Sequence, residues 1–86
     1  MFKVFLSRRA SKDYVALPIQ IRPRVLTAIH TLADDPYSGK KLRGEHDGHW
    51  SLRVWPYRII YIIEKETVTV TVVTIGHRKD VYGRLG

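Results

Sequence analysis

Apolar residues alternate with other residues at the start of the chain and then recur at helical spacing. A period of two over residues 2–6 is typical of a strand with one buried face. Ser7 follows this strand and can cap a helix, which Pro18 ends. The apolar face of the strand consists of Phe2, Val4 and Leu6, and that of the helix of Ala10, Tyr14 and Leu17.

A second helix is predicted from one continuous apolar stripe, which must lie against another apolar surface. Proline is tolerated only in the first turn of a helix, where its missing N–H would have had no partner. Pro23 therefore places the start of this helix near residues 20–22, and Pro36 places its end. The stripe consists of Ile21, Val25, Ala28, Ile29, Leu32 and Ala33.

The second half of the chain predicts a long loop and three strands. Residues 37–48 are polar and basic, contain glycine and show no period, which indicates a loop. Residues 49–54 alternate, a turn follows at 55–56, and residues 57–63 and 68–75 are rich in β-branched and aromatic residues, as antiparallel strands are. The alternation puts Trp50, Leu52 and Val54 on one face and His49, Ser51 and Arg53 on the other.

This order of elements predicts one α+β domain over residues 1–86. Two N-terminal helices are expected to pack on one face of a mainly antiparallel four-stranded sheet, in the order strand, helix, helix, strand, strand, strand. The other face of the sheet is left to solvent or to a ligand. A chain of 86 residues is too short for two self-sufficient cores.

Composition excludes several classes of protein. The chain has no apolar run of the roughly 20 residues that a membrane span needs, and Met1–Leu6 lacks the pattern of a secretory signal. It contains no cysteine, which rules out disulfides and thiolate metal sites. Four scattered histidines show no metal-ligand spacing, so we expect a cytoplasmic protein without metal or cofactor.

The charge points to a polyanionic partner. Fifteen Lys and Arg stand against eight Asp and Glu, a formal net charge of +7. Such an excess favours anions through Coulomb attraction and counterion release. RNA, DNA or an acidic protein would each fit, and the alternative is that the charge serves only solubility.

The order of elements and a series of local strings resemble the RelE/ParE superfamily of bacterial toxins. The resemblance implies the RelE-like fold and the role of toxin in a type II toxin-antitoxin system. RelE-like members cut messenger RNA in the ribosomal A site and so inhibit translation, whereas ParE-like members inhibit DNA gyrase without being nucleases. The strings include Leu32-Ala33-Asp34-Asp35-Pro36, Lys41-Leu42-Arg43-Gly44, Tyr57-Arg58-Ile59-Ile60-Tyr61 and Ile75-Gly76-His77-Arg78.

Metal-free RNA cleavage needs phosphate clamps and groups that move protons, because the ribose 2'-hydroxyl attacks the adjacent phosphate. Arg58 and Arg78 match the arginines of RelE-like nucleases, and a guanidinium is suited to phosphate. His77 is a candidate for proton transfer, since the unperturbed pKa of histidine is about 6.5. Tyr82 matches a C-terminal tyrosine of these enzymes. The alternatives are a structural Arg58 in an ion pair and a Tyr82 that only fixes the tail.

Further polar and aromatic residues are candidates for RNA binding, although loop cations are usually just solvated. Two of them, His49 and Ser51, stand where RelE-like enzymes carry catalytic lysines, so the gyrase-inhibitor alternative and an inactive homologue stay open. His30 and His46 receive no role. The RNA-binding candidates are Lys40, Lys41, Arg43, His49, Ser51, Arg53 and Trp55.

The resemblance also implies the partners of this chain. A cognate antitoxin is expected to wrap the domain with an acidic segment and to block its basic face, and complementary charge makes such an encounter fast. The other expected partner is mRNA in the ribosomal A site. The toxin is expected to be monomeric when free and part of a hetero-oligomer with its antitoxin, with no membrane partner.

Overall fold

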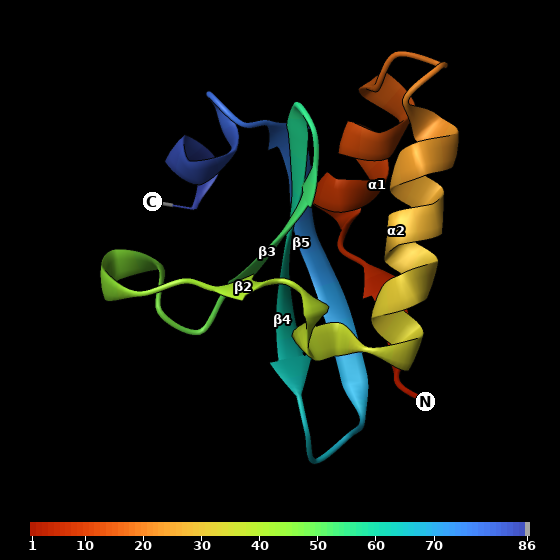
Figure 1. The fold of residues 1–86 in the computed structure, drawn as a ribbon. Helices are drawn as coiled ribbons and strands as arrows, with labels where there is room; N and C mark the ends of the chain where they lie inside the picture. The colour runs from red at the N-terminus through yellow and green to blue at the C-terminus, as the bar shows by residue number, and fades with distance from the viewer. Residues whose placement is uncertain (86) are drawn as a thin grey trace.

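The structure is a computed structural model that describes residues 1–85. Two helices lie side by side on one face of a five-stranded sheet (Figure 1). The helices are α1 (Arg8–Ala16) and α2 (Arg22–Asp34), and the strands are β1 (Lys3–Leu6), β2 (Lys40–Lys41), β3 (Trp50–Val54), β4 (Tyr57–Glu64) and β5 (Thr69–His77). Three short 3-10 turns complete the chain: η1 (Pro36–Ser38), η2 (Gly44–His46) and η3 (Val81–Arg84).

The strand order is β1-β5-β4-β3-β2. β1 runs parallel to β5, and all the other neighbours are antiparallel. The α+β class and the two helices on one sheet face are as predicted, but the expected number of four strands is wrong. The additional strand is β2, in which Lys40 pairs with Ser51 and Lys41 with Trp50, within the segment expected to be a loop.

Both helices begin as the sequence predicts. The Ser7 hydroxyl accepts a hydrogen bond from the backbone N–H of Ala10 at 3.0 Å and donates one to the carbonyl of Val73 at 2.7 Å, so it caps α1 and ties it to the sheet. α2 begins at Arg22 with proline in its first turn. Neither helix is long and apolar enough to span a membrane in the part of the chain that the structure describes.

The core lies between the helices and the sheet. The side chains of Trp50, Leu52 and Val54 face the helices, as the alternation predicts. Tyr61 is fully buried there, and its hydroxyl donates to the carbonyl of Pro36 at 2.7 Å and accepts from the N–H of Gly39 at 3.2 Å. The fully buried centre of the core consists of Ala10, Val25, Leu32, Ile59, Tyr61, Val70 and Val72.

The opposite face of the sheet is partly covered by the C-terminal turn η3, which lies on the side away from the helices (Figure 1). Ile60 and Val81 are fully buried, yet neither belongs to the core beneath the helices. Thr74, the cross-strand partner of Ile60, is 2% exposed. The turn therefore encloses a second, smaller apolar contact, and the remainder of this face carries the polar residues considered next.

Candidate nucleic-acid interface

Strands β2, β3 and β4 bring cations together on the face away from the helices. Arg53 and Arg58 stand directly opposite each other in the β3–β4 pair, and Lys40 stands opposite Ser51 in the β2–β3 pair. Directly opposed residues project to the same face of a sheet. A groove of about 340 Å³ follows this face. Its lining consists of Ser38, Gly39, Lys40, Ser51, Leu52, Arg53 and Arg58.

The arginines of this face have no carboxylate partners among residues 1–85. The ion pairs found in residues 1–85 join Asp13 to Arg9 and to Arg84. Neither pair involves Arg53 or Arg58. The Nε atom of Arg58 is buried without a hydrogen-bond partner. Like charges placed directly opposite each other destabilise a sheet, so this arrangement costs folding free energy that an anion in the groove would offset.

The turn η3 places Tyr82 beside two lining residues of the groove, Ser51 and Arg58. Its hydroxyl donates a hydrogen bond to the Ser51 hydroxyl at 3.2 Å, and its ring centroid lies 5.9 Å from the Cζ atom of Arg58. Two of the residues predicted for catalysis, Arg58 and Tyr82, are therefore neighbours although 24 positions separate them in the chain. A phenol and a guanidinium together offer hydrogen-bond donors to a phosphate or a ribose.

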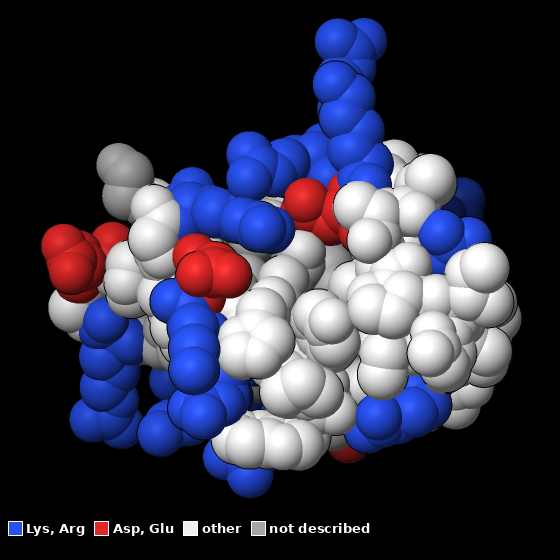
Figure 2. Space-filling view, turned by 90° about the horizontal axis from the view of Figure 1, so that it is seen from above, with Lys and Arg blue, Asp and Glu red and all other residues white. Residues whose placement is uncertain are grey.

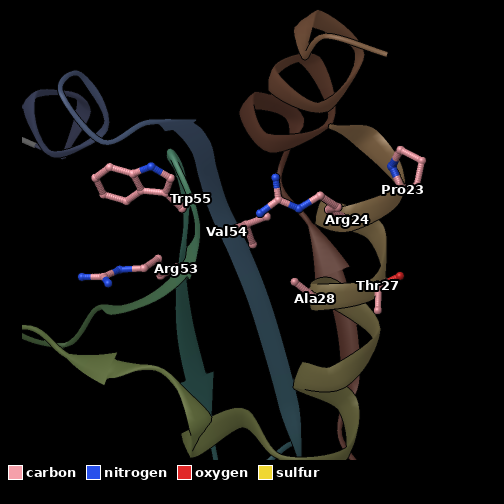
Figure 3. Close-up of a pocket in the computed structure, with 7 residues that line it drawn as sticks. All are labelled: Pro23, Arg24, Thr27, Ala28, Arg53, Val54 and Trp55. Carbon is pink, nitrogen blue, oxygen red and sulfur yellow. The ribbon is translucent and has the colours of Figure 1, made fainter. Parts of the chain in front are cut away.

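The turn between β3 and β4 connects Arg78 with these cations. The Cζ atom of Arg78 lies 4.6 Å from the ring centroid of Trp55, and that of Arg53 lies 5.7 Å from it. Both distances are within the range of cation–π attraction. Figure 3 shows that Trp55 and Arg53 project away from α2, whereas Val54 between them points toward it. Arg53 and Arg78 thus share the half-exposed indole of Trp55, and Arg53 in turn stands opposite Arg58.

The end of the molecule that carries the β3–β4 turn and η3 is rich in exposed cations. Seen from this end, Lys and Arg side chains occupy much of the surface on the side of η3, and fewer acidic side chains lie between them (Figure 2). Part of the net charge of +7 is therefore concentrated at this end. A basic surface of this kind attracts polyanions at long range.

His77 does not lie in the groove. It stands opposite Tyr57 in the β4–β5 pair, and the two rings meet edge-on with centroids 5.7 Å apart. Tyr57 packs against the core beneath the helices, and the His77 Nδ1 atom accepts a hydrogen bond from the N–H of Lys79. The expectation that His77 shares a site with Arg58 is wrong in its placement, because successive residues of a strand project to opposite faces.

His46 is the histidine that the structure brings next to Tyr82. Its ring centroid lies 5.8 Å from that of Tyr82, and its Nδ1 atom is buried without a hydrogen-bond partner. Gly44 and Gly48 flank it with positive φ angles of 69° and 91°, a conformation that glycine adopts at little cost. Sequence reasoning missed His46 because these turns decide its position and no periodicity reveals them.

The remaining candidates divide between the groove and its surroundings. Lys40 lines the groove, but Lys41 stands opposite Trp50 and therefore projects to the other face. Arg43 is exposed just before η2. His49 precedes β3, and its Nδ1 atom is buried without a hydrogen-bond partner.

Comparison with known proteins supports the resemblance to the RelE/ParE superfamily. The sequence model described as "ParE toxin of type II toxin-antitoxin system, parDE" matches residues 4–82. The chain is 35% identical to Toxin RelG of Mycobacterium tuberculosis over 96% of this chain and 98% of that protein.

Solved structures of toxins share the fold. The toxin-antitoxin complex RelBE2 from Mycobacterium tuberculosis contains a chain with a TM-score of 0.81 and 34% identity, covering 92% of this chain and 93% of that one. The isolated E. coli RelE toxin has a TM-score of 0.77 at 23% identity, over 98% and 94% of the two chains. The family match over nearly the whole sequence and the shared architecture lead to one conclusion: this chain belongs to the RelE/ParE superfamily of type II toxins.

Proposed function

We propose that this toxin is an endoribonuclease that cleaves mRNA in the ribosomal A site and so inhibits translation. The observation that carries the proposal is the placement of Tyr82 beside Arg58 in a groove whose arginines have no carboxylate partners among the described residues. Such a groove offers preorganised positive charge to a phosphate, which is the main requirement for metal-free cleavage. The reaction would take place in the cytoplasm, where translating ribosomes are found.

The chemistry assigns a role to each residue of the groove. The ribose 2'-oxygen forms a bond to phosphorus, the bond from phosphorus to the 5'-oxygen breaks, and a 2',3'-cyclic phosphate remains. Arg58 would stabilise the charge that grows on the phosphoryl oxygens, with Arg53 and Arg78 holding the neighbouring backbone. Tyr82 would contact the attacking hydroxyl. His46, in place of His77, would take up the proton of the 2'-hydroxyl and return it to the leaving 5'-oxygen.

The test is cleavage of a programmed message on purified ribosomes. Removing one preorganised donor typically lowers the rate about 100- to 1,000-fold, and we expect a loss of this size for Arg58→Ala. Arg8→Ala removes an exposed cation of α1 on the other side of the sheet and should cleave at the parental rate. Equal rates for Arg58→Ala and the parent would show that the groove is not the active centre.

Inhibition of DNA gyrase is a second candidate, and two observations favour it. The matching family model is named for ParE toxins, and the strand that carries catalytic lysines in RelE-like enzymes presents Ser51 here, with its hydroxyl bonded to Tyr82. Sequencing transcript ends after induction separates the two activities. New ends within codons indicate the nuclease, whereas DNA damage without new ends indicates the gyrase inhibitor.

The proposal includes a cognate antitoxin. Several structural relatives are toxins in complex with antitoxins, among them RelBE2 from Mycobacterium tuberculosis and the E. coli RelBE complex. A groove lined by Lys40, Arg53 and Arg58 without a carboxylate is suited to an acidic segment of such a partner.

A further inference from the structure

The edge of β5 extends beyond the strand that pairs with it. β1 pairs with residues 69–72 only, whereas β5 continues to His77. The backbone groups of the following residues on this edge have no strand partner, and buried backbone groups without partners cost free energy. Ile75 is 1% exposed, so its N–H and its carbonyl both need a partner from elsewhere.

Two side chains of opposite charge supply these partners. The Oδ2 atom of Asp13, on α1, accepts hydrogen bonds from the Ile75 N–H at 3.0 Å and from the Thr74 hydroxyl at 2.6 Å. The Nη1 atom of Arg84, in η3, donates to the Ile75 carbonyl at 3.0 Å. The same Nη1 atom lies 3.4 Å from the Oδ1 atom of Asp13. We name this set of contacts between Asp13, Arg84 and the edge of β5 the edge clasp.

The surroundings strengthen the edge clasp. The side chain of Asp13 is 11% exposed and Thr74 is 2% exposed, and charge-assisted hydrogen bonds are stronger where water is excluded. The guanidinium of Arg84 lies directly against the backbone of Gly76. A Cβ atom on Gly76 would be 2.7 Å from Nη1 and 3.1 Å from Cζ, so only glycine leaves room for Arg84 in this position.

Both ends of η3 are held in place. Val81 is fully buried at one end of η3 and Arg84 is held by the edge clasp at the other, so Tyr82 lies on a short turn fixed at both ends. We propose that Asp13 and Arg84 are positioning residues that hold Tyr82 against Ser51 and Arg58, although neither is placed in the groove. The inference rests on the proposed function to the extent that Tyr82 acts in cleavage.

The first experiment measures the position of η3 without any RNA. Arg84→Gln and Arg9→Gln each remove one cation from the same carboxylate of Asp13, but Arg9 is 56% exposed and lies on α1 beside it. We expect amide hydrogen exchange at residues 81–85 to accelerate roughly 10- to 100-fold in Arg84→Gln and Asp13→Asn. We expect no change in Arg9→Gln. The ring resonances of 13C-labelled Tyr82 should shift in the first two variants only.

The second experiment is a double-mutant cycle on ribosomal cleavage. Arg84→Gln should lower the single-turnover rate in the parent and have little further effect once Tyr82→Ala has removed the side chain that it positions. Arg84→Lys, which keeps a cation, should recover part of the rate.

Two results would overturn the edge clasp as a positioning device. One is equal amide exchange at residues 81–85 in Arg84→Gln and Arg9→Gln. The other is additivity in the cycle, in which the double variant loses as much cleavage free energy as Arg84→Gln and Tyr82→Ala do together. If no variant and not even the parent cleaves RNA, the proposed nuclease is wrong, whereas the exchange data still decide whether Asp13 and Arg84 hold Tyr82.

Discussion

Tyr61 lies beneath the basic face and fixes the segment that leads to it. Its hydroxyl hydrogen-bonds to the backbone of both Pro36 and Gly39. These two residues are the ends of the segment that comes directly before Lys40 and the groove. Burial in the core is the main cause that raises the pKa of Tyr61 to about 12, and the nearby carboxylate of Asp35 adds to it. The phenol is therefore a neutral structural group at physiological pH.

We expect Tyr61→Phe to lower the free energy of unfolding by about 1–3 kcal/mol at pH 7, because buried polar groups at Pro36 and Gly39 lose their partner. A tyrosine in the unfolded chain ionises near pH 10, below the folded pKa of about 12. The contribution of the neutral buried phenol to the free energy of unfolding is therefore complete below pH 10. It is lost as the pH rises toward 12.

Urea denaturation of both proteins between pH 9 and 11 measures this effect. The difference in unfolding free energy between parent and Tyr61→Phe should shrink by about 1 kcal/mol over that range. A difference that stays constant with pH would contradict the role assigned to burial of this hydroxyl.

Single residues of the groove were predictable where strand alternation decides their direction. Alternation places Ser51 and Arg53 on the face away from the helices, and the β3–β4 register adds Arg58. The same rule separates His77 from Arg58, and adjacency to Arg78 in the sequence was misleading because neighbours in a strand project to opposite faces. His46 was not predictable, since it reaches Tyr82 through a loop shaped by turns and not by a repeating pattern.

At the scale of elements, the helices and the long strands follow from periodicity, whereas β2 does not. A strand of two residues is too short to show a period of two, and its position depends on a tertiary contact. Gly39 comes directly before it, and a Cβ atom there would be 2.4 Å from the Tyr61 hydroxyl and 2.7 Å from the Ser51 carbonyl. The close approach of β2 to β3 therefore requires glycine at this position.

Replacing Gly39 with alanine should displace β2 and Lys40 from the edge of the groove. We expect a loss of about 1–3 kcal/mol in unfolding free energy, which is typical of overpacking in a region without free space. Gly83→Ala is the matched control, because no atom beyond its two chain neighbours lies within 4 Å of its added Cβ. Chemical denaturation of both variants tests the prediction, and equal stabilities would show that β2 can move at no cost.

At the scale of the whole molecule, the sheet separates two surfaces of different character. The helices cover one face and bury the core. On the other face lie Lys40, Arg53 and Arg58, and Arg78 lies over the indole of Trp55 in the β3–β4 turn. The basic composition suggested a polyanionic partner, but only the strand register and the C-terminal turn show which cations lie together. The assignment to the RelE/ParE superfamily was confirmed.

The salt dependence of RNA binding should report the number of phosphate groups that this basic face contacts. For single-stranded RNA the slope of log affinity against log salt changes by about 0.7 for each phosphate contact. We expect Arg53→Gln to reduce the slope by about this amount for an uncleavable 2'-O-methyl oligoribonucleotide, and Arg8→Gln on α1 to leave it unchanged. Filter binding over a salt series measures both slopes, and identical changes would mean that the cations act only through net charge.

The parallel pairing of β1 with β5 affects how the chain can fold during its synthesis, because β1 is made early and its partner strand is made late. A ribosome makes β1, α1 and α2 first, yet the partner of β1 and the three long strands of the sheet come from residues 50–77. Part of the apolar stripe of α2 stays uncovered until those residues emerge, so the growing chain exposes apolar surface that favours aggregation. Arg58 and Tyr82 come together later still, because η3 is the last element to be made, so the pairing of these two side chains requires nearly the whole chain.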